Sequence, residues 1–332
     1  MMSLQKAWFS ERKWVYLLLP LSTLFYLLSA LRRLAFRLGL LSSGKPAAKV
    51  IIVGNISVGG NGKTPTVIAI AKHLSSKGYS CGILSRGYGG DQTEFPYHVK
   101  STDEPSLVGD EPALISRRLS CPVVIDPVRR RGADYLSTTL SCDVIICDDG
   151  LQHYALKRDF EIVVMDGRGI GNGFLLPAGP LRETQKRLKN VDVIVHNSEL
   201  VPSCISQELK SKTVQMRLRA TRWVNVKSGQ ISDNIREKST LNQCSALAGI
   251  GDPKRFFSTL KALEIECSEL LPFPDHHQFT NHDLPNNMVL MTEKDAVKIK
   301  PFAHDNCWYL EVEGDIEALF FEKIEQKLNS VQ

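Results

Sequence analysis

The feature that most constrains this sequence is a glycine-rich loop between an apolar segment and an amphipathic one. Residues 50–53 are apolar and β-branched, residues 54–65 spell GNISVGGNGKTP, and residues 66–78 have helical spacing. Such a loop lets backbone N–H groups surround phosphate oxygens, and the helix N-terminus behind it favours negative charge. The sequence therefore predicts a strand, a phosphate-binding loop and a helix, which together form a unit of a parallel sheet covered by helices.

The end of this loop matches a nucleotide-binding pattern, with one departure near its start. Lys63 is expected to reach the β- and γ-phosphates, and the Thr64 hydroxyl is expected to ligate Mg²⁺. Ser57 stands where the pattern has its first glycine, so the loop is a variant. A glycine-rich turn with a chance lysine is the alternative. The residues expected around the phosphates are Ser57, Val58, Gly59, Gly60, Asn61, Gly62, Lys63 and Thr64.

Further apolar runs continue the alternation of strand and helix. We expect strands at 79–85, 122–126, 143–149, 161–167 and 192–197, with helical segments between several of them. Because these runs are apolar throughout, both faces of the sheet are expected to be buried. The predicted fold class is α/β: a P-loop NTPase-like parallel sheet with helices on both faces.

The chain of 332 residues has room for two domains. We expect the nucleotide-binding domain at 45–212, followed by an antiparallel linker or small hairpin at 213–242, where polar and apolar residues alternate. A second series of strands and helices predicts a smaller α/β domain at 243–332. Residues 1–40 are expected to form a separate N-terminal membrane-anchor helix.

This N-terminal segment contains eighteen uncharged residues, 14–31, between Arg12-Lys13 and Arg32-Arg33. A helix of that length spans about 27 Å, just short of the roughly 30 Å hydrocarbon core of a bilayer. Its aromatic and basic residues favour a membrane interface. A signal peptide is disfavoured because no small-residue cleavage site follows, and a core helix is the remaining alternative. If the helix crosses, the basic residues after it place the body in the cytoplasm.

Charge and cysteine content narrow the class of protein. The net charge is +5, but residues 1–49 hold eight bases and one acid, and the rest of the chain holds 33 bases and 35 acids. The body is therefore not basic, which argues against a nucleic-acid partner. The eight cysteines have no metal-ligand spacing, and several lie in apolar runs, as is typical of reduced cytosolic thiols.

A pair of carboxylates follows the expected strand at 143–147. Asp148 and Asp149 would stand at its carboxyl end, where parallel sheets bind ligands and where a carboxylate can hold Mg²⁺ or its water shell. A single Asp after a strand is common in loops. Its combination with the phosphate loop favours a nucleoside triphosphate site.

Three other charged pairs are candidates for chemistry on an acceptor. Asp110-Glu111 precedes a helix, where acids also serve as caps, and His276-His277 follows a proline-rich turn. A kinase acting on a hydroxyl needs a base, and an Asp held by a His could supply it. Arg182-Glu183 could clamp a phosphate and ligate a metal, or could form an exposed ion pair.

Several sequence blocks resemble one family, the tetraacyldisaccharide 4′-kinases, which are the membrane-associated lipid A 4′-kinases of Gram-negative bacteria. The blocks are GNISVGGNGKTP, SRGYGG, GDEP, DDGLQH, DGRGIGNGFLLPAGPLRE, AGIGDPKRFF, FPDHH and MTEKDA, in the order of the family. The resemblance covers about residues 14–310, and the combination of DDGLQH with LLPAGPLRE is its most specific part.

The resemblance implies an ATP-dependent phosphorylation of the 4′-hydroxyl of a tetraacyldisaccharide 1-phosphate, which gives lipid IV-A in lipid A (lipopolysaccharide) biosynthesis. Lys63 would be catalytic, and Asp110, paired with His276, would act as the base. Tyr88, Glu111, Gln152, His153 and Arg182 would lie in or beside the site. The candidate Mg²⁺ ligands are Thr64, Asp148, Asp149 and Glu183, without an assignment among the three carboxylates.

The resemblance also implies that the substrate lipid and the membrane surface are the partners. The protein would lie at the cytoplasmic face of the inner membrane, without an obligate protein partner. An alternative of another class is a membrane-tethered P-loop NTPase switch that acts on a protein, although no guanine-specifying NKxD is present. A non-catalytic lipid-binding module is a third interpretation.

Overall fold

The computed structural model describes residues 4–10, 13–60, 62–233, 235 and 244–330. Its strands lie in the order β11-β10-β12-β13-β8-β7-β6-β1-β5-β2-β4-β3, with β9 paired to β8. The strands are β1 (Lys49–Gly54), β2 (Cys81–Ser85), β3 (Tyr97–Val99), β4 (Val123–Ile125), β5 (Val144–Asp148), β6 (Phe160–Met165), β7 (Val193–His196), β8 (Thr213–Asn225), β9 (Ile231–Ser232), β10 (Ser245–Ala248), β11 (Glu269–Pro272), β12 (Val289–Thr292) and β13 (Cys307–Ile316).

The larger part of the fold is a parallel sheet with β1 near its centre. β1 lies between β5 and β6, and Val53 of β1 is level with Asp148 of β5 and Ile162 of β6. The pairs β6–β7, β5–β2 and β2–β4 are also parallel, whereas the short edge strand β3 is antiparallel. The carboxyl ends of β1 and β5 therefore meet at one edge, as the sequence predicted.

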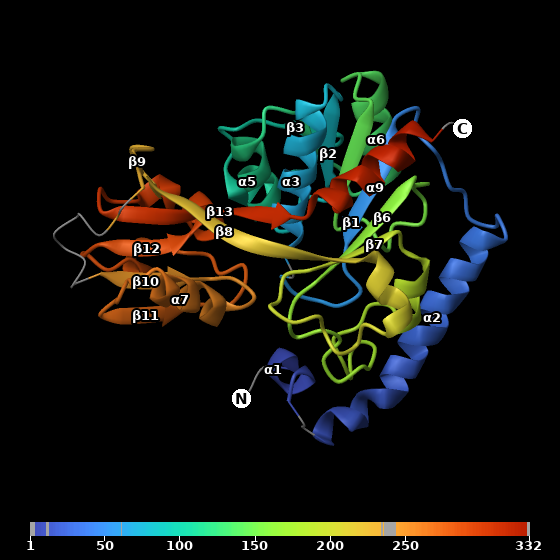
Figure 1. Ribbon diagram of the computed structural model, residues 1–332, viewed down its shortest axis with the longest axis horizontal. Coiled ribbons are helices and arrows are strands. Elements are labelled where there is room, and N and C mark those ends of the chain that lie inside the picture. Colours follow the sequence, from blue (N-terminus) through green and yellow to red (C-terminus); the bar gives the residue numbers. More distant parts are fainter. Residues whose placement is uncertain (1–3, 11–12, 61, 234, 236–243, 331–332) are drawn as a thin grey trace.

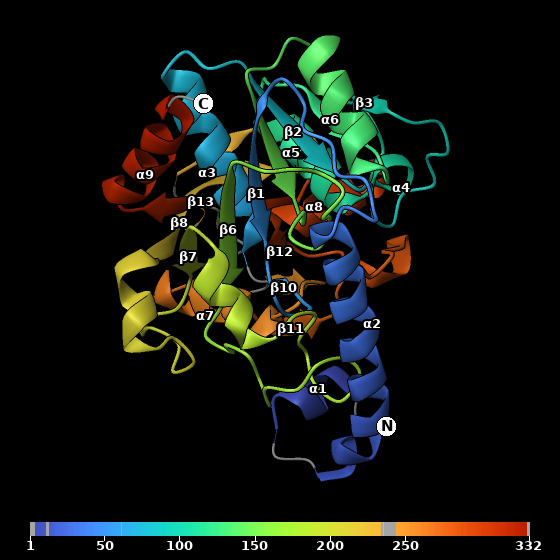
Figure 2. The same ribbon diagram turned by 90° about the vertical axis from the view of Figure 1, so that its right-hand side faces the viewer.

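Helices cover both faces of this sheet (Figures 1 and 2). On one face lie α3 (Lys63–Ser76), α4 (Pro105–Val108), α5 (Asp110–Arg118) and α9 (Ala318–Asn329), whose apolar side chains share a core with β1. On the other face lie α6 (Arg129–Thr138) and two 3-10 helices, Gln185–Asn190 and Gln207–Lys212. The predicted α/β fold class is confirmed.

A second, smaller α/β region follows. In it β10, β11, β12 and β13 are mutually parallel, with α7 (Pro253–Ala262) and α8 (Glu293–Ile299) packed on opposite faces. Short 3-10 helices complete it at Asn281–Asp283 and Lys300–Phe302. We did not predict β3 or β11, and both are short strands at sheet edges.

The segment that we expected to be a linker or small hairpin has a larger structural role. It forms β8, a strand of 13 residues that is parallel to β7 at its start and antiparallel to β13 over most of its length. Figure 1 shows β8 passing from the larger to the smaller region. Only the C-terminal end of β8 pairs with β9 as a hairpin, at Trp223 and Val224. The alternation of polar and apolar residues predicted that this segment forms a strand, but it did not predict the pairing with β13.

The N-terminal segment forms α1 (Leu4–Trp8), a 3-10 helix (Lys13–Leu18) and α2 (Leu19–Arg37). Pro20 lies in the first turn of α2, where its missing N–H costs nothing. Among the described residues, one helical stretch, Lys13–Arg37, is long and apolar enough to cross a bilayer, and only 11% of its most apolar window is buried. It is therefore not a core helix, and Figure 2 shows α2 along the outside of the body.

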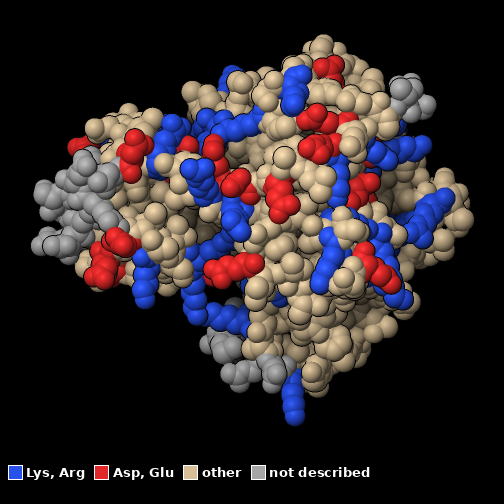
Figure 3. All heavy atoms as spheres, viewed as in Figure 1, with Lys and Arg blue, Asp and Glu red and all other residues tan. Residues whose placement is uncertain are grey.

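The N-terminal segment contacts the body through α2 and through the 3-10 helix before it. Ser22 Oγ donates to the carbonyl of Leu175 and accepts from the Ala178 N–H, and the rings of Tyr16 and Phe174 meet edge to face. Acidic and basic side chains are interspersed on the face of the molecule drawn in Figure 3.

Candidate active site

The phosphate loop connects β1 to α3 in the way its sequence predicts. Gly59 and Gly62 have φ values of 114° and 90°, which favour glycine. A Cβ on Gly62 would also clash with Nδ2 of Asn197, the residue after β7, so a side chain here would displace the Asn197 amide. Lys63 is the first residue of α3 and Thr64 follows it, so both lie at the positive end of the helix.

A second segment, 180–182, supports the loop from behind. Val58 donates its N–H to the carbonyl of Pro180, and Arg182 donates its N–H to the carbonyl of Ile56. Ser57 is 5% exposed and forms an antiparallel bridge with Leu181. Ser57, the position where the loop departs from the nucleotide-binding pattern, therefore helps to hold the loop in place. The LLPAGPLRE block contacts the phosphate loop directly through these backbone bonds.

Asp148 and Asp149 end β5 beside this loop, in different electrostatic states. Asp148 is 4% exposed, its Oδ1 has no hydrogen-bond partner, and burial raises its pKa to about 7. For Asp149, burial raises the pKa, but the charges of Lys63 and Arg182 outweigh it and hold the pKa below its usual value. Its carboxylate lies 3.8 Å from Lys63 Nζ and 2.9 Å from Arg182 Nη1. Two adjacent carboxylates with opposite pKa shifts are typical of sites with divided roles.

Glu183 is buried and already bonded. Gln152 donates to its Oε1 at 2.8 Å, Tyr154 donates to its Oε2 at 2.5 Å, and Arg187 Nε lies 3.5 Å away. Gln152 also donates to the carbonyl of Asn55 at the start of the phosphate loop. The predicted metal ligand Glu183 is thus linked to the loop through Gln152.

Across the site, Asp110 at the start of α5 contacts His276, which follows β11. Nδ1 of the imidazole lies 3.0 Å from Asp110 Oδ2, so residues 166 positions apart in the sequence are in contact. The bond to Asp110 raises the pKa of His276. Burial alone would raise the pKa of Asp110. The bond from His276 and the charges of Lys298 and Lys294 outweigh burial, so this pKa lies below its usual value. Tyr88, which is 66% exposed, lies edge to face with His276 at 5.7 Å.

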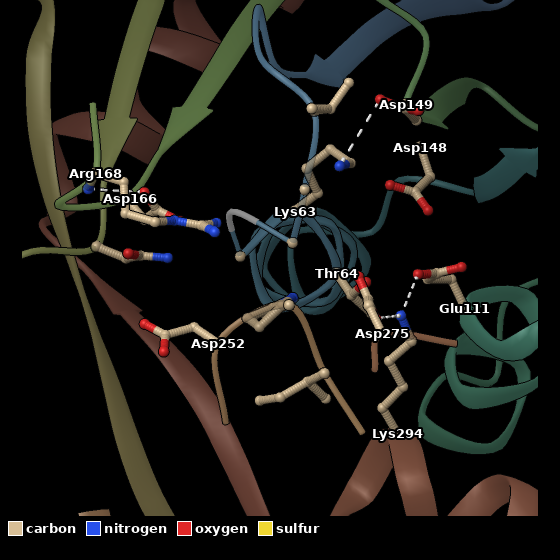
Figure 4. A pocket seen from close by; sticks show the side chains of 18 of the residues that line it. Lys63, Thr64, Glu111, Asp148, Asp149, Asp166, Arg168, Asp252, Asp275 and Lys294 are labelled. Atoms are coloured by element: carbon tan, nitrogen blue, oxygen red, sulfur yellow. Dashed lines mark hydrogen bonds and ion pairs between the residues drawn. The ribbon is translucent and has the colours of Figure 1, made fainter. Parts of the chain in front are cut away.

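One cavity of about 1810 Å³ is lined by the phosphate loop, Asp148, Asp149, Glu183 and His276. Nearly all the predicted site residues line it; Ser57 and Asp110 are buried next to it, and Asn61 lies outside the described residues. Figure 4 shows Lys63 pointing to Asp149 on one side of α3, with Lys294 reaching Glu111 and Asp275 on the other. His153 lines the wall, where burial lowers its pKa to about 4 and keeps it neutral.

Some residues of this cavity were not predicted from the sequence. Arg129, 3% exposed, donates to the backbone carbonyls of Asp126 and Asp148 from the first residue of α6. Its position after β4 was the available signal, because this is again the carboxyl edge of the sheet. Arg32 and Arg33 of α2 also line the cavity, and so does Lys294 of α8. Lys294 belongs to the MTEKDA block, but we had given it no role.

Comparison with known proteins identifies the family of this chain. The sequence model of the family described as tetraacyldisaccharide-1-P 4′-kinase matches residues 14–329. The chain is 49% identical to the tetraacyldisaccharide 4′-kinase of Pseudoalteromonas atlantica, over 95% of this chain and 100% of that protein. It is 45% identical to the enzyme of the same name from Actinobacillus succinogenes, over 96% and 97% of the two chains.

A solved structure supports the same relationship. LpxK from Aquifex aeolicus, determined in complex with ATP, superposes with a TM-score of 0.78 at 29% identity and covers 95% of this chain and 99% of its own. Both the family match and the relatives extend over nearly the whole length. The chain belongs to the tetraacyldisaccharide-1-P 4′-kinase family.

Proposed function

We propose that this protein transfers the γ-phosphoryl group of ATP to the 4′-hydroxyl of a tetraacyldisaccharide 1-phosphate, giving lipid IV-A. The observation that carries the proposal is that one cavity is lined by a phosphate loop and, across it, by His276, whose partner Asp110 is buried behind it. The first can hold the donor and the second can activate an acceptor hydroxyl. Family membership supplies the identity of the acceptor.

The loop and Lys63 hold the donor. Backbone N–H groups at the start of α3 face phosphate oxygens, and the Lys63 ammonium balances charge on the β- and γ-phosphates as the transferring group loosens. Lys63 Nζ lies 3.8 Å from Asp149 Oδ1, which is beyond hydrogen-bond distance, so the ammonium can turn to a phosphate without breaking a hydrogen bond to Asp149. Arg182 then remains as the partner of Asp149.

The residues around Asp148 fit a magnesium ion. Its buried Oδ1 has no hydrogen-bond partner, and burial raises its pKa in spite of the charges of Lys63 and Arg129. Oxygen ligands of this kind, with a threonine hydroxyl, suit Mg²⁺. Thr64 and Asp148 would hold the ion, and the ion would neutralise phosphate charge. Glu183 is placed to hold Gln152 in position, since both its oxygens accept hydrogen bonds.

The Asp110–His276 pair takes the proton of the acceptor. The hydroxyl oxygen attacks the γ-phosphorus, the bond from that phosphorus to the β–γ bridging oxygen breaks, and ADP leaves. The hydroxyl proton passes to the Asp110 carboxylate, whose other oxygen His276 holds at 3.0 Å. A depressed pKa on Asp110 keeps the carboxylate ionised and ready to orient the hydroxyl.

The stretch from Lys13 to Arg37 anchors the protein at the cytoplasmic face of the inner membrane. Its outward leucines are exposed, while its inner side contacts the body at Leu175 and Ala178. Arg32 and Arg33 line the same cavity as the phosphate loop. A sugar headgroup could therefore enter the site while its acyl chains stay beside α2.

The test supplies γ-labelled ATP and tetraacylated disaccharide 1-phosphate in detergent micelles. We expect label in the lipid, with Mg²⁺ required. Label found only in free phosphate would favour the alternative, a membrane-tethered NTPase switch. No nucleotide turnover with bound lipid would favour a lipid-binding module.

A further inference from the structure

Lys294, in the first turn of α8, lies next to the proposed base but has no part in the transfer described above. Its Nζ lies 2.9 Å from Glu111 Oε1, 3.2 Å from Asp275 Oδ1 and 3.4 Å from His276 Nε2. The other nitrogen of the same imidazole faces Asp110. One ammonium therefore contacts the sequence neighbours of both members of the pair, and the imidazole itself.

These contacts decide which nitrogen of His276 carries the proton. An ammonium has only donors, so a Lys294 N–H directed at Nε2 needs the lone pair of that nitrogen. The neutral imidazole then carries its proton on Nδ1 and donates it to Asp110 Oδ2. The ionised Asp110 carboxylate also only accepts, so Lys294 and Asp110 favour the same tautomer, and Lys294 adds the contact that fixes the other edge of the ring.

The charges around the pair make this lysine necessary. The titratable and charged groups that face His276 and Asp110 are Tyr88, Glu111, Asp275, Lys294 and Lys298. Glu111 and Asp275 raise the pKa of His276, and Lys294 lowers it. Burial lowers the pKa of Lys294, but the charges of Glu111 and Asp275 outweigh burial and hold this pKa above its usual value, so the ammonium stays charged.

Lys294 also joins the two regions of the fold. Glu111 lies on α5 of the larger region and Lys294 on α8 of the smaller one. A separate pair, Arg118 with Glu293 at 2.8 Å, joins the same two helices without a contact to His276 in the described residues. Among the described residues, α5 and α8 therefore share one ion pair beside the proposed base, Glu111–Lys294, and one away from it, Arg118–Glu293.

We infer that Lys294 is a positioning residue: it holds His276 in the tautomer and orientation that bond Asp110, and it ties that arrangement to α5 through Glu111. The inference rests on the proposed kinase function, since it assigns His276 and Asp110 to proton transfer. In this role Lys294 acts through His276 and Glu111 and not on the reacting groups.

The test compares Lys294→Met with Lys294→Arg in the full-length protein. We expect Lys294→Met to lower kcat by about 10²-fold, as a misplaced catalytic group does, with the KM for ATP changed less than about threefold. Because Lys294 lowers the pKa of His276, its loss should move the NMR titration midpoint of His276 and the acid limb of kcat to higher pH. Lys294→Arg should restore most of kcat and the midpoint.

Two controls separate positioning from stability. Lys300→Met, at an exposed position just after α8, should leave kcat and the midpoint unchanged. Glu293→Gln removes the other ion pair between α5 and α8 and should lower Tm without moving the His276 midpoint. Circular dichroism checks that each variant folds.

Several results would overturn the inference. They are an unmoved His276 midpoint in Lys294→Met, an equal movement in Glu293→Gln, no recovery in Lys294→Arg, or a raised KM for ATP with unchanged kcat. The midpoint is measured without turnover. A wild-type protein that transfers no label to lipid would therefore count against the kinase proposal, while the titration still tests Lys294.

Discussion

Three outward leucines of α2 offer a test of the anchor that leaves the site intact. Leu24, Leu28 and Leu31 recur with helical spacing and are 53%, 59% and 64% exposed. The helix contacts the body through its other side, at Ser22. Replacing all three leucines by serine therefore removes apolar surface without removing those contacts.

The magnitude follows from the exposed surface. Burying a whole leucine side chain is worth about 1.5–3 kcal/mol, so the half that remains exposed on each is worth about 1 kcal/mol in lipid. Three such residues give about 3 kcal/mol, which corresponds to a roughly 10²-fold weaker partition into vesicles. Leucines elsewhere in the stretch Lys13–Arg37, such as Leu17 at 82% exposed, keep part of the affinity.

The assay is sedimentation with vesicles of phosphatidylethanolamine and phosphatidylglycerol, beside ATP binding on the same preparation. The matched control replaces Leu200 and Leu319, which are 82% and 52% exposed on other elements, by serine. We expect the α2 variant to lose vesicle binding, and both variants to bind ATP normally. Vesicle binding by the α2 variant within about threefold of wild type would refute the area argument.

Other perturbations test the nucleotide site, the base and the anchor as a whole. Lys63→Ala should lower kcat by on the order of 10²–10³-fold with the fold intact. The control Lys77→Ala, at an exposed position at the far end of α3, should leave kcat unchanged. Near-normal turnover by Lys63→Ala would contradict the assignment of the phosphate loop. Asp110→Asn should lower kcat strongly at nearly unchanged ATP affinity, and its loss should not add to that of His276→Gln, since the two act as a unit; additive losses in the double variant would separate them. Removal of residues 1–40 should abolish vesicle binding and preserve ATP binding, because the phosphate loop begins at Gly54; a truncated protein that still sediments with vesicles would place the anchor elsewhere.

The nucleotide half of the site could be predicted because it depends on local patterns and one rule of sheet geometry. The glycine loop, Lys63 and Thr64 are contiguous in sequence. Asp148 and Asp149 lie 85 and more residues later, but parallel strands bring their carboxyl ends to one edge. The pairing of Val53 with Asp148 confirms the expected edge.

The acceptor half could not be predicted in this way. Asp110 and His276 belong to different parts of the fold, and their contact depends on β8, whose pairing with β13 joins the two sheets. A pattern of alternation predicts a strand but carries no information about its partner. Resemblance to a family suggested the pair, whereas Lys294 and Arg129 required the three-dimensional contacts.

Two residues of the site share a backbone conformation that only glycine adopts without cost. Asp149 has φ 51° and His276 has φ 60°, on opposite sides of the cavity. Such conformations are rare and cost about 1–3 kcal/mol, so they persist where surrounding contacts determine them. Asp149 is held by Lys63 and Arg182, and His276 by Asp110 and Lys294. Contacts from other elements thus hold both turns, with Asp149 beside Lys63 and His276 beside Asp110. The cost of these conformations accounts for the cation that another element places beside each turn: Lys63 of α3 lies beside Asp149, and Lys294 of α8 lies beside His276.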